Sequence, residues 1–318
     1  MSVEKDLSLQ PFTFEKVSLK EILFFTHSPC NFFTEKNLFT PCISQGQKIS
    51  KNFFVQLASQ KNLDLLWRKD DSNNFNLFIK KEIIEICKKF SHGSPIHNGL
   101  RLLNLCLLHQ KSVYKDPFNK ETLQEYHQIT KLISEVFNNS QKYIPEIFQK
   151  FTKIDHYYLH SQPIKATLIF SHLLEESKVF EKKFNQSLFI TSLLKDIGMS
   201  LVDKNVLDSK TLGEKQKLEI HNHSHFSYLL CKDGLHLSTT QLNLIKHHHD
   251  IKSEKILFGP ELIFLHFSDV LSAMISDRPY RPKNSLYKAL ELIKISTPAS
   301  NKEEFKFLVN FSTKFFSV

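Results

Sequence analysis

The sequence predicts a mostly α-helical protein in which a small mixed domain precedes a larger helical one. Apolar residues recur at helical spacing from about residue 81 onward, whereas short apolar stretches separated by turn residues fill 14–85. Only 7 of the 318 residues are glycine, which argues against a glycine-rich nucleotide loop or a turn-dense β-sandwich. With 41% hydrophobic residues the chain can bury a sizeable core in two domains.

The first part of the chain, residues 1–85, is expected to be a small α/β or α+β domain. Its apolar stretches at 22–25, 31–33 and 63–67 are short, and turn-type residues such as Ser28-Pro29 separate them. Ser50 can cap a helix that carries Phe53, Phe54 and Leu57. No catalytic constellation falls here, so we expect a regulatory or accessory module.

The rest of the chain is expected to be helical, as a helical linker region over 86–150 and a helical metal-binding domain over 151–318. Ser94-Pro95 and Asp116-Pro117 mark breaks in the first of these regions. In the second, apolar periodicity predicts helices over 156–180, 186–197, 212–231, 239–249, 260–277 and 285–295.

Composition also limits where the protein works. No apolar run approaches the roughly 18 residues needed to span a bilayer, and the N-terminus does not resemble a signal peptide. The five cysteines are scattered, odd in number and without a CxxC motif, which fits a reducing compartment rather than a disulfide framework or a thiolate zinc site. We therefore expect a cytoplasmic protein that does not act at a membrane.

The formal charge of +9 is compatible with an anionic ligand, with nonspecific binding to nucleic acid, or with a solvated lysine-rich surface. We expect no specific nucleic-acid partner. Four of the basic residues are arginines, and two of those, Arg278 and Arg281, share one Arg-Pro-Tyr-Arg tetrapeptide. Arginine side chains grip phosphate through paired hydrogen bonds, so this tetrapeptide is a candidate phosphate site.

Histidines and isolated acids suggest a metal centre. Residues 247–250 read His-His-His-Asp, and Asp196 and Asp269 each stand alone in an apolar helix, where a carboxylate is costly unless it is paired or metal-bound. Imidazoles and carboxylates are the usual ligands of borderline and hard divalent metals. His248 and His249 diverge by about 100° on a helix, so both can reach one ion only at the helix edge. Each residue alone has an ordinary explanation as a solvated or buried polar side chain, but together they predict a metal site.

These residues, taken in order, resemble the HD-GYP family, all-helical phosphodiesterases of the HD superfamily that open cyclic di-GMP. The resemblance covers roughly residues 150–295. Residues 14–85 also resemble the small domain that precedes some HD-GYP domains. The most specific part of the resemblance over 150–295 is the spacing between 268–273 (Ser-Asp-Val-Leu-Ser-Ala) and 277–281 (Asp-Arg-Pro-Tyr-Arg). The remaining matches are His160-Ser161, Leu-Leu-Lys-Asp-Ile-Gly at 193–198, His223 and His248-His249-Asp250.

The resemblance implies an all-helical bundle with two divalent ions, iron or alternatively manganese, and cyclic di-GMP as the ligand. It implies that a water bridging the ions becomes a hydroxide that attacks the phosphodiester. Arg278 and Arg281 would neutralise the phosphate oxygens. The implied metal ligands are Asp196, which bridges the ions and is the catalytic carboxylate, His160 and Asp269 on one ion, and His223, His248 and His249 on the other.

The chain departs from the family pattern at several positions. Lys195 stands where the family has the histidine of its His-Asp pair, and Met199 stands where a lysine is usual. Asp250 replaces the usual glutamate, and His156 replaces a possible third-metal acid, which favours two ions over three. His247 could also serve in place of His249.

The Gly-Tyr-Pro loop is missing, since the stretch from His249 to Asp269 is shorter than usual and Phe258-Gly259-Pro260 matches it in part. This predicts a more open cleft. Two functions therefore stand side by side. One is a binuclear cyclic di-GMP phosphodiesterase. The other is a catalytically degenerate relative that acts as a cyclic di-GMP receptor or as an adaptor for protein partners in second-messenger signalling.

Overall fold

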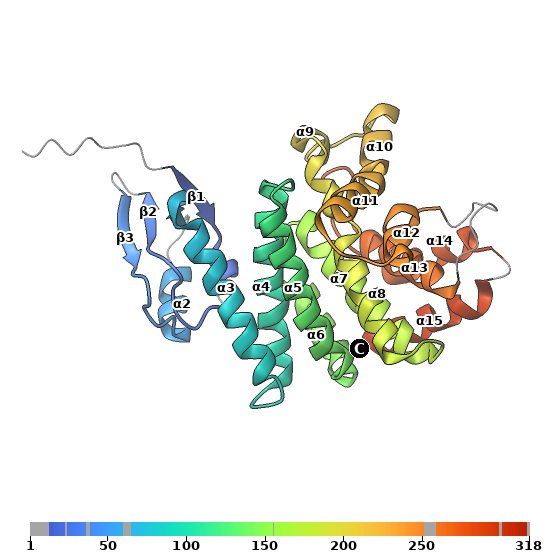
Figure 1. The fold of residues 1–318 in the computed structure, drawn as a ribbon, viewed down its shortest axis with the longest axis horizontal. Helices are drawn as coiled ribbons and strands as arrows, with labels where there is room; N and C mark the ends of the chain where they lie inside the picture. Colours follow the sequence, from blue (N-terminus) through green and yellow to red (C-terminus); the bar gives the residue numbers. More distant parts are fainter. Residues whose placement is uncertain are drawn as a thin grey trace, which may run out of the picture. The chain divides into compact units, whose positions relative to one another are not determined.

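The computed structural model describes residues 13–22, 24–35, 39–59, 65–154, 156–250, 259–298 and 301–316. The chain divides into two compact units, Met1–Glu82 and Ile83–Val318 (Figure 1). Across the described residues, none of the helices combines the length and the apolar character required to span a membrane.

The first unit is built on a four-stranded antiparallel sheet with the strand order β1-β4-β2-β3. Of the two arrangements expected from the sequence, this is α+β. Trp67 of the sheet stacks on Phe75 of helix α3 with ring centroids 4.7 Å apart, which joins sheet and helix in one core. The elements are β1 (Phe14–Val17), α1 (Leu19–Ile22), β2 (Phe32–Glu35), β3 (Phe39–Ile43), α2 (Lys51–Ala58), β4 (Leu65–Arg68), the 3-10 turn η1 (Lys69–Asp71) and α3 (Ser72–Lys88), whose residues from Ile83 onward belong to the second unit.

The caps and breaks expected from the sequence are confirmed. Ser50 precedes α2, and its side chain accepts a hydrogen bond from the backbone N–H of Phe53 at 3.2 Å. Ser94 caps α4 (Pro95–Lys115) with Pro95 in the first turn, and the helix ends directly before Asp116-Pro117. Such side chains satisfy backbone donors that lack partners at a helix start.

The second unit is entirely helical in its described part. Its elements are α4 (Pro95–Lys115), α5 (Lys120–Asn138), η2 (Gln141–Tyr143), α6 (Ile144–Thr152), α7 (Tyr158–Ser177), α8 (Lys182–Leu194), η3 (Ile197–Leu201), α9 (Lys204–Leu207), α10 (Glu214–His221), α11 (His223–Gly234), α12 (Thr239–His247), α13 (Pro260–Met274), α14 (Leu286–Ser296) and α15 (Lys302–Phe316).

Helix α7 lies at the centre of this unit. It packs against α8 and against α13 (Figure 1). Most of its side chains are buried. The helices between residues 86 and 150 pack in the same unit, because α4 contacts α5, α6, α7 and η3. The functional division at residues 85 and 150 stays a prediction. The C-terminal helix α15 was not expected from the sequence, and it packs on α6, α7 and α13.

The single helix expected over 212–231 is two helices, which corrects the sequence interpretation. Asn222 ends α10 and directly precedes α11, so His223 becomes the first residue of a new helix. The break allows η3 to approach α11 closely. The backbone N–H of Gly198 donates to Ser227 Oγ at 2.8 Å, and a Cβ built on Gly198 would lie 2.2 Å from the carbonyl oxygen of His223. Residue 198 must therefore be glycine for this contact to form.

We expect Gly198→Ala to destabilise the fold markedly, because the added methyl group meets backbone atoms that cannot move aside. Overpacking of this kind typically costs about 1–3 kcal/mol, and the short contact places this variant at the upper end or beyond. Gly213→Ala is the matched control, since its Cβ would come no closer than 3.8 Å to Gln216 Oε1. Thermal denaturation of both variants measures the difference, and equal melting temperatures would contradict the expectation.

Candidate metal centre

Five of the predicted metal ligands lie on four segments of the second unit. Asp196 follows the end of α8, His223 begins α11, His248 and His249 follow the end of α12, and Asp269 lies in the middle of α13. The residues at helix ends lie where the backbone turns, so their side chains are not confined to one face of a helix. The structure brings these five residues together.

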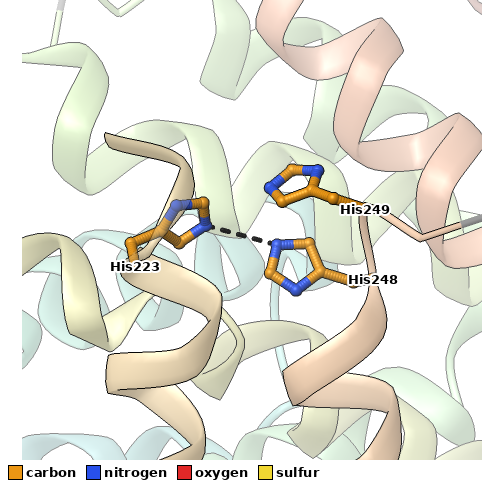
Figure 2. A group of neighbouring side chains, drawn as sticks. All are labelled: His223, His248 and His249. Atoms are coloured by element: carbon orange, nitrogen blue, oxygen red, sulfur yellow. Dashed lines mark hydrogen bonds between the residues drawn. The ribbon is translucent and has the colours of Figure 1, made fainter. Parts of the chain in front are cut away.

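Three imidazoles form the heart of the group. The ligand atoms of His223, His248 and His249 lie within 4.8 Å of one another, and Figure 2 shows the three rings around one space. The Nε2 atoms of His223 and His248 are 3.3 Å apart. This arrangement favours His248-His249 over His247-His248 as the ligand pair, because His247 Nδ1 instead pairs with Asp250 Oδ2 at 2.8 Å.

Hydrogen bonds to backbone carbonyls at helix ends set the tautomers of two histidines. His223 Nδ1 donates to the carbonyl oxygen of Ile220 at 2.5 Å, and His248 Nδ1 donates to that of Ile245 at 2.8 Å. A neutral imidazole that donates through Nδ1 carries its lone pair on Nε2. Two lone pairs therefore converge, an arrangement that a cation between them stabilises. Backbone carbonyls commonly orient metal-binding histidines in this way.

Burial favours the neutral form of two of these imidazoles, those of His248 and His249. It holds the pKa of His248 well below its usual range and lowers the pKa of His249 to about 4. Desolvation disfavours the charged form of a histidine, and neighbouring imidazoles and the Lys195 ammonium add to the effect. Both rings are then free of a second proton near pH 7 and keep a lone pair for a cation.

Asp196 connects the histidines to a buried lysine. Its Oδ1 lies 3.2 Å from His223 Nε2 and 3.6 Å from His248 Nε2, while its Oδ2 accepts a hydrogen bond from Lys195 Nζ. Its backbone carbonyl accepts a hydrogen bond from the Tyr114 hydroxyl at 2.9 Å, which fixes the turn after α8. One carboxylate thus faces two differently charged neighbours.

Lys195 is fully buried, with 0% of its surface exposed. Its Nζ also donates to Asp269 Oδ1 at 2.5 Å, so the ammonium lies between two carboxylates. Burial alone would lower the pKa of Lys195, but Asp196 and Asp269 raise it above its usual value. Burial alone would raise the pKa of both acids, but the ammonium lowers them. The three groups form one charged cluster.

His160 lies outside the three-histidine group in the described part of the chain. Its ring contacts are with Tyr114 and Tyr157, whose ring centroids are 5.1 and 5.7 Å away. Burial, together with the nearby Lys111 and His156, lowers its pKa to about 3. Its Nδ1 is buried and has no hydrogen-bond partner among the described residues, and its role as a metal ligand stays a prediction.

A cleft of about 330 Å³ opens onto the centre. Asp196, His223, His249 and Asp269 line it, and so do Arg278 and Arg281. Met199, which stands where the family has a lysine, also lines the cleft. The expectation of a more open cleft concerns the segment after Asp250, and residues 251–258 lie outside the described residues.

The two arginines are held by their own loop. Their backbones pair, with Arg278 N–H donating to the carbonyl of Arg281 at 2.9 Å and the reverse bond at 3.1 Å. The Arg278 guanidinium donates to Tyr280 Oη at 2.6 Å, and that of Arg281 donates to the carbonyl of Ala273 at 2.8 Å. Both Nε atoms are buried and lack a hydrogen-bond partner within the described residues.

Sequence reasoning missed Gln162, which joins the arginines to the acids. Its Oε1 accepts a hydrogen bond from Arg278 at 2.5 Å, and its Nε2 donates to Asp269 Oδ1 at 3.3 Å. Tyr114 was missed as well. In the sequence, Gln162 and Tyr114 are each visible only as a polar side chain in an apolar helix, and this does not show which residue each one bonds.

The donor atoms of the centre fit one of the two divalent ions that the resemblance implies. Three imidazoles and Asp196 Oδ1 offer nitrogen and oxygen donors that fit one divalent ion. The space between Asp196 and Asp269 does not fit a second ion, because the Lys195 ammonium lies there.

Comparison with known proteins supports the fold. No protein-family model matches the chain, and no curated protein matches it. Among solved structures, Bd1817, described as a HDG"Y"P protein from Bdellovibrio bacteriovorus, matches with a TM-score of 0.68 and 12% sequence identity. The match covers 94% of this chain and 100% of that one. The chain therefore has the fold of an HD-GYP protein, with a small N-terminal α+β unit followed in the sequence by a helical bundle.

Proposed function

We propose that the chain is a metal-dependent phosphodiesterase that hydrolyses cyclic di-GMP. The observation that carries the proposal is one cleft lined both by metal-type ligands and by Arg278 and Arg281. Ligands of this kind serve metal-assisted hydrolysis, and paired arginines serve phosphate binding. The likeness in fold to an HD-GYP protein and the resemblance of the motifs support the same reaction.

The histidine side of the centre would hold the metal. His223, His248, His249 and Asp196 Oδ1 are the proposed ligands, and iron, or alternatively manganese, is the proposed ion. A divalent cation bound there supplies Lewis acidity, which brings the pKa of water toward neutral and withdraws charge from a phosphoryl oxygen. Burial lowers the pKa of His248 and His249 and so keeps both rings in the neutral form, which can bind a cation without first losing a proton.

The arginines would bind the phosphate. Arg278 is held in place by Gln162 and Tyr280, and its guanidinium lies 5.5 Å from the centre of the Tyr158 ring. A guanidinium fixed in this way loses little entropy when it binds. Its charge, and that of Arg281, would neutralise the negative charge that grows on the phosphate oxygens in the transition state.

The direct test is turnover. The protein is loaded with ferrous iron under anaerobic conditions, or with manganese, and incubated with cyclic di-GMP. We expect the linear dinucleotide or GMP to appear on chromatography, and His223→Ala to be inactive. The absence of product with both ions would sink the proposal.

A cyclic di-GMP receptor or a protein adaptor is the second candidate. It is favoured by Lys195 at one of the family's ligand positions and by Met199 in the cleft. Titration calorimetry separates the candidates, because a receptor binds cyclic di-GMP and returns it intact. A chain that neither binds nor hydrolyses it would leave the adaptor role.

Arg278→Lys should lower kcat/KM for cyclic di-GMP by roughly 10- to 100-fold. Lysine keeps the charge but loses the planar fork that binds phosphate through two bonds, and it cannot also reach Gln162 and Tyr280. Arg101→Lys on α4 is the matched control and should leave kcat/KM unchanged. Equal kinetics for the two variants would remove Arg278 from the phosphate site.

A further inference from the structure

The position of Lys195 raises the question of how many ions the centre holds. The residue lies in the turn after α8, and no part of it is exposed to solvent. A lysine in such a place is costly unless its charge is matched. Asp196 Oδ2 and Asp269 Oδ1 supply that match, the second at 2.5 Å from Nζ.

The geometry of the ammonium is that of a cation in its site. Its nitrogen contacts one oxygen from each of two carboxylates, which come from different segments of the chain. A divalent ion shared by the same two oxygens would sit about 2.0–2.2 Å from each. The nitrogen of Lys195 therefore takes up the space that an ion would need.

The charge balance of the cluster also favours a single divalent ion. The two carboxylates exceed the ammonium by one negative charge, and the remaining oxygen of Asp196, Oδ1, faces His223 and His248. One divalent ion on the histidine side meets that excess. A second divalent ion next to the ammonium would add like charges in a buried site, where their repulsion is least screened.

We propose that the Lys195 ammonium replaces one of two metal ions, so that the centre binds a single divalent ion per chain. This rests on the proposed function for the ion at the histidines. Lys195 is then a positioning residue, because it directs Asp196 Oδ1 toward the histidines and holds Asp269 in place. It also supplies a permanent positive charge beside the cleft that does not depend on metal supply.

Metal stoichiometry of the whole chain tests this. Purified protein is saturated with manganese, freed of excess ion and measured by elemental analysis and by electron paramagnetic resonance. We expect one ion per chain with the six-line spectrum of an isolated manganese ion. Lys195→His should raise the stoichiometry to two and give the exchange-coupled spectrum of two neighbouring ions.

Two further variants serve as controls. Lys195→Arg keeps the cation and should stay at one ion. Lys165→Met removes a different buried lysine, which lies on α7 and donates a hydrogen bond to Ser276 Oγ at 3.2 Å. This variant should also bind one ion. Circular dichroism and thermal denaturation establish that each variant is folded before its metal is counted.

The outcomes are distinct. Two ions in the unaltered protein would overturn the replacement and leave the phosphodiesterase proposal intact, and this measurement needs no variant to fold. No ion at saturating manganese would defeat the metal-dependent function and the single-ion centre together. A folded Lys195→His protein that still binds one ion would show that the ammonium is not what excludes the second.

Discussion

We expect Asp196→Asn to lose the proposed metal ion and the proposed phosphodiesterase activity together. Asparagine has nearly the same shape, but it lacks the negative charge that attracts a cation and leaves Lys195 with one charged partner instead of two. Loss of residues that merely support a ligand costs about 10- to 100-fold in metal affinity, so loss of the ligand itself should cost roughly 100-fold or more. Manganese affinity by calorimetry and product formation from cyclic di-GMP are the two measurements.

Asp250→Asn is the matched control for this experiment. Asp250 lies directly after the histidine run, but its carboxylate pairs with His247 and is partly exposed. Its loss should leave both affinity and turnover near their original values. If Asp196→Asn kept the original manganese affinity, the carboxylate would not be a ligand.

Asp269→Ala should be among the most destabilising single substitutions in the chain. It removes one of the two carboxylates that match the buried Lys195 ammonium. Breaking a buried ion pair by removal of one partner typically costs about 3–5 kcal/mol, because a charge stays behind without compensation. Urea denaturation of the metal-free protein measures the loss without a contribution from bound ion.

A second substitution distinguishes this cause from simple loss of packing. In the double variant Asp269→Ala with Lys195→Met, the uncompensated charge is gone, so we expect part of the lost free energy of unfolding to return. Additive losses in the double variant would show that the two groups do not interact. Asp250→Ala, which removes a carboxylate near the surface, should change the free energy of unfolding far less.

Much of the fold could be predicted because the helices depend on local sequence patterns. The spacing of apolar residues marks the helices, and Ser50 and Ser94 mark two of their starts. The break at Asn222 was missed because apolar periodicity continues on both sides of a single turn residue. The break accompanies the approach of η3 to α11 at Gly198, a contact between segments that a local pattern does not contain.

The candidate site shows the same division. The pair His248-His249 at a helix end and the isolated acids Asp196 and Asp269 are visible in the sequence, because their polarity conflicts with their surroundings. From the sequence alone, Lys195 indicates only the loss of a metal-binding histidine. That its ammonium meets two carboxylates depends on the packing of α13 beside the end of α8, so it required the three-dimensional structure.

Gln162 connects the arginine side of the cleft to the acidic side through hydrogen bonds. Through a single amide it accepts from Arg278 and donates to Asp269, which in turn holds Lys195. A nucleotide phosphate that draws Arg278 toward itself therefore changes the hydrogen bonding of Asp269, on the far side of the same amide. We therefore expect occupancy of the proposed phosphate position and of the proposed ion position to be thermodynamically linked, and such a linkage is reciprocal. Substrate should tighten or loosen the ion by the same factor by which the ion tightens or loosens substrate.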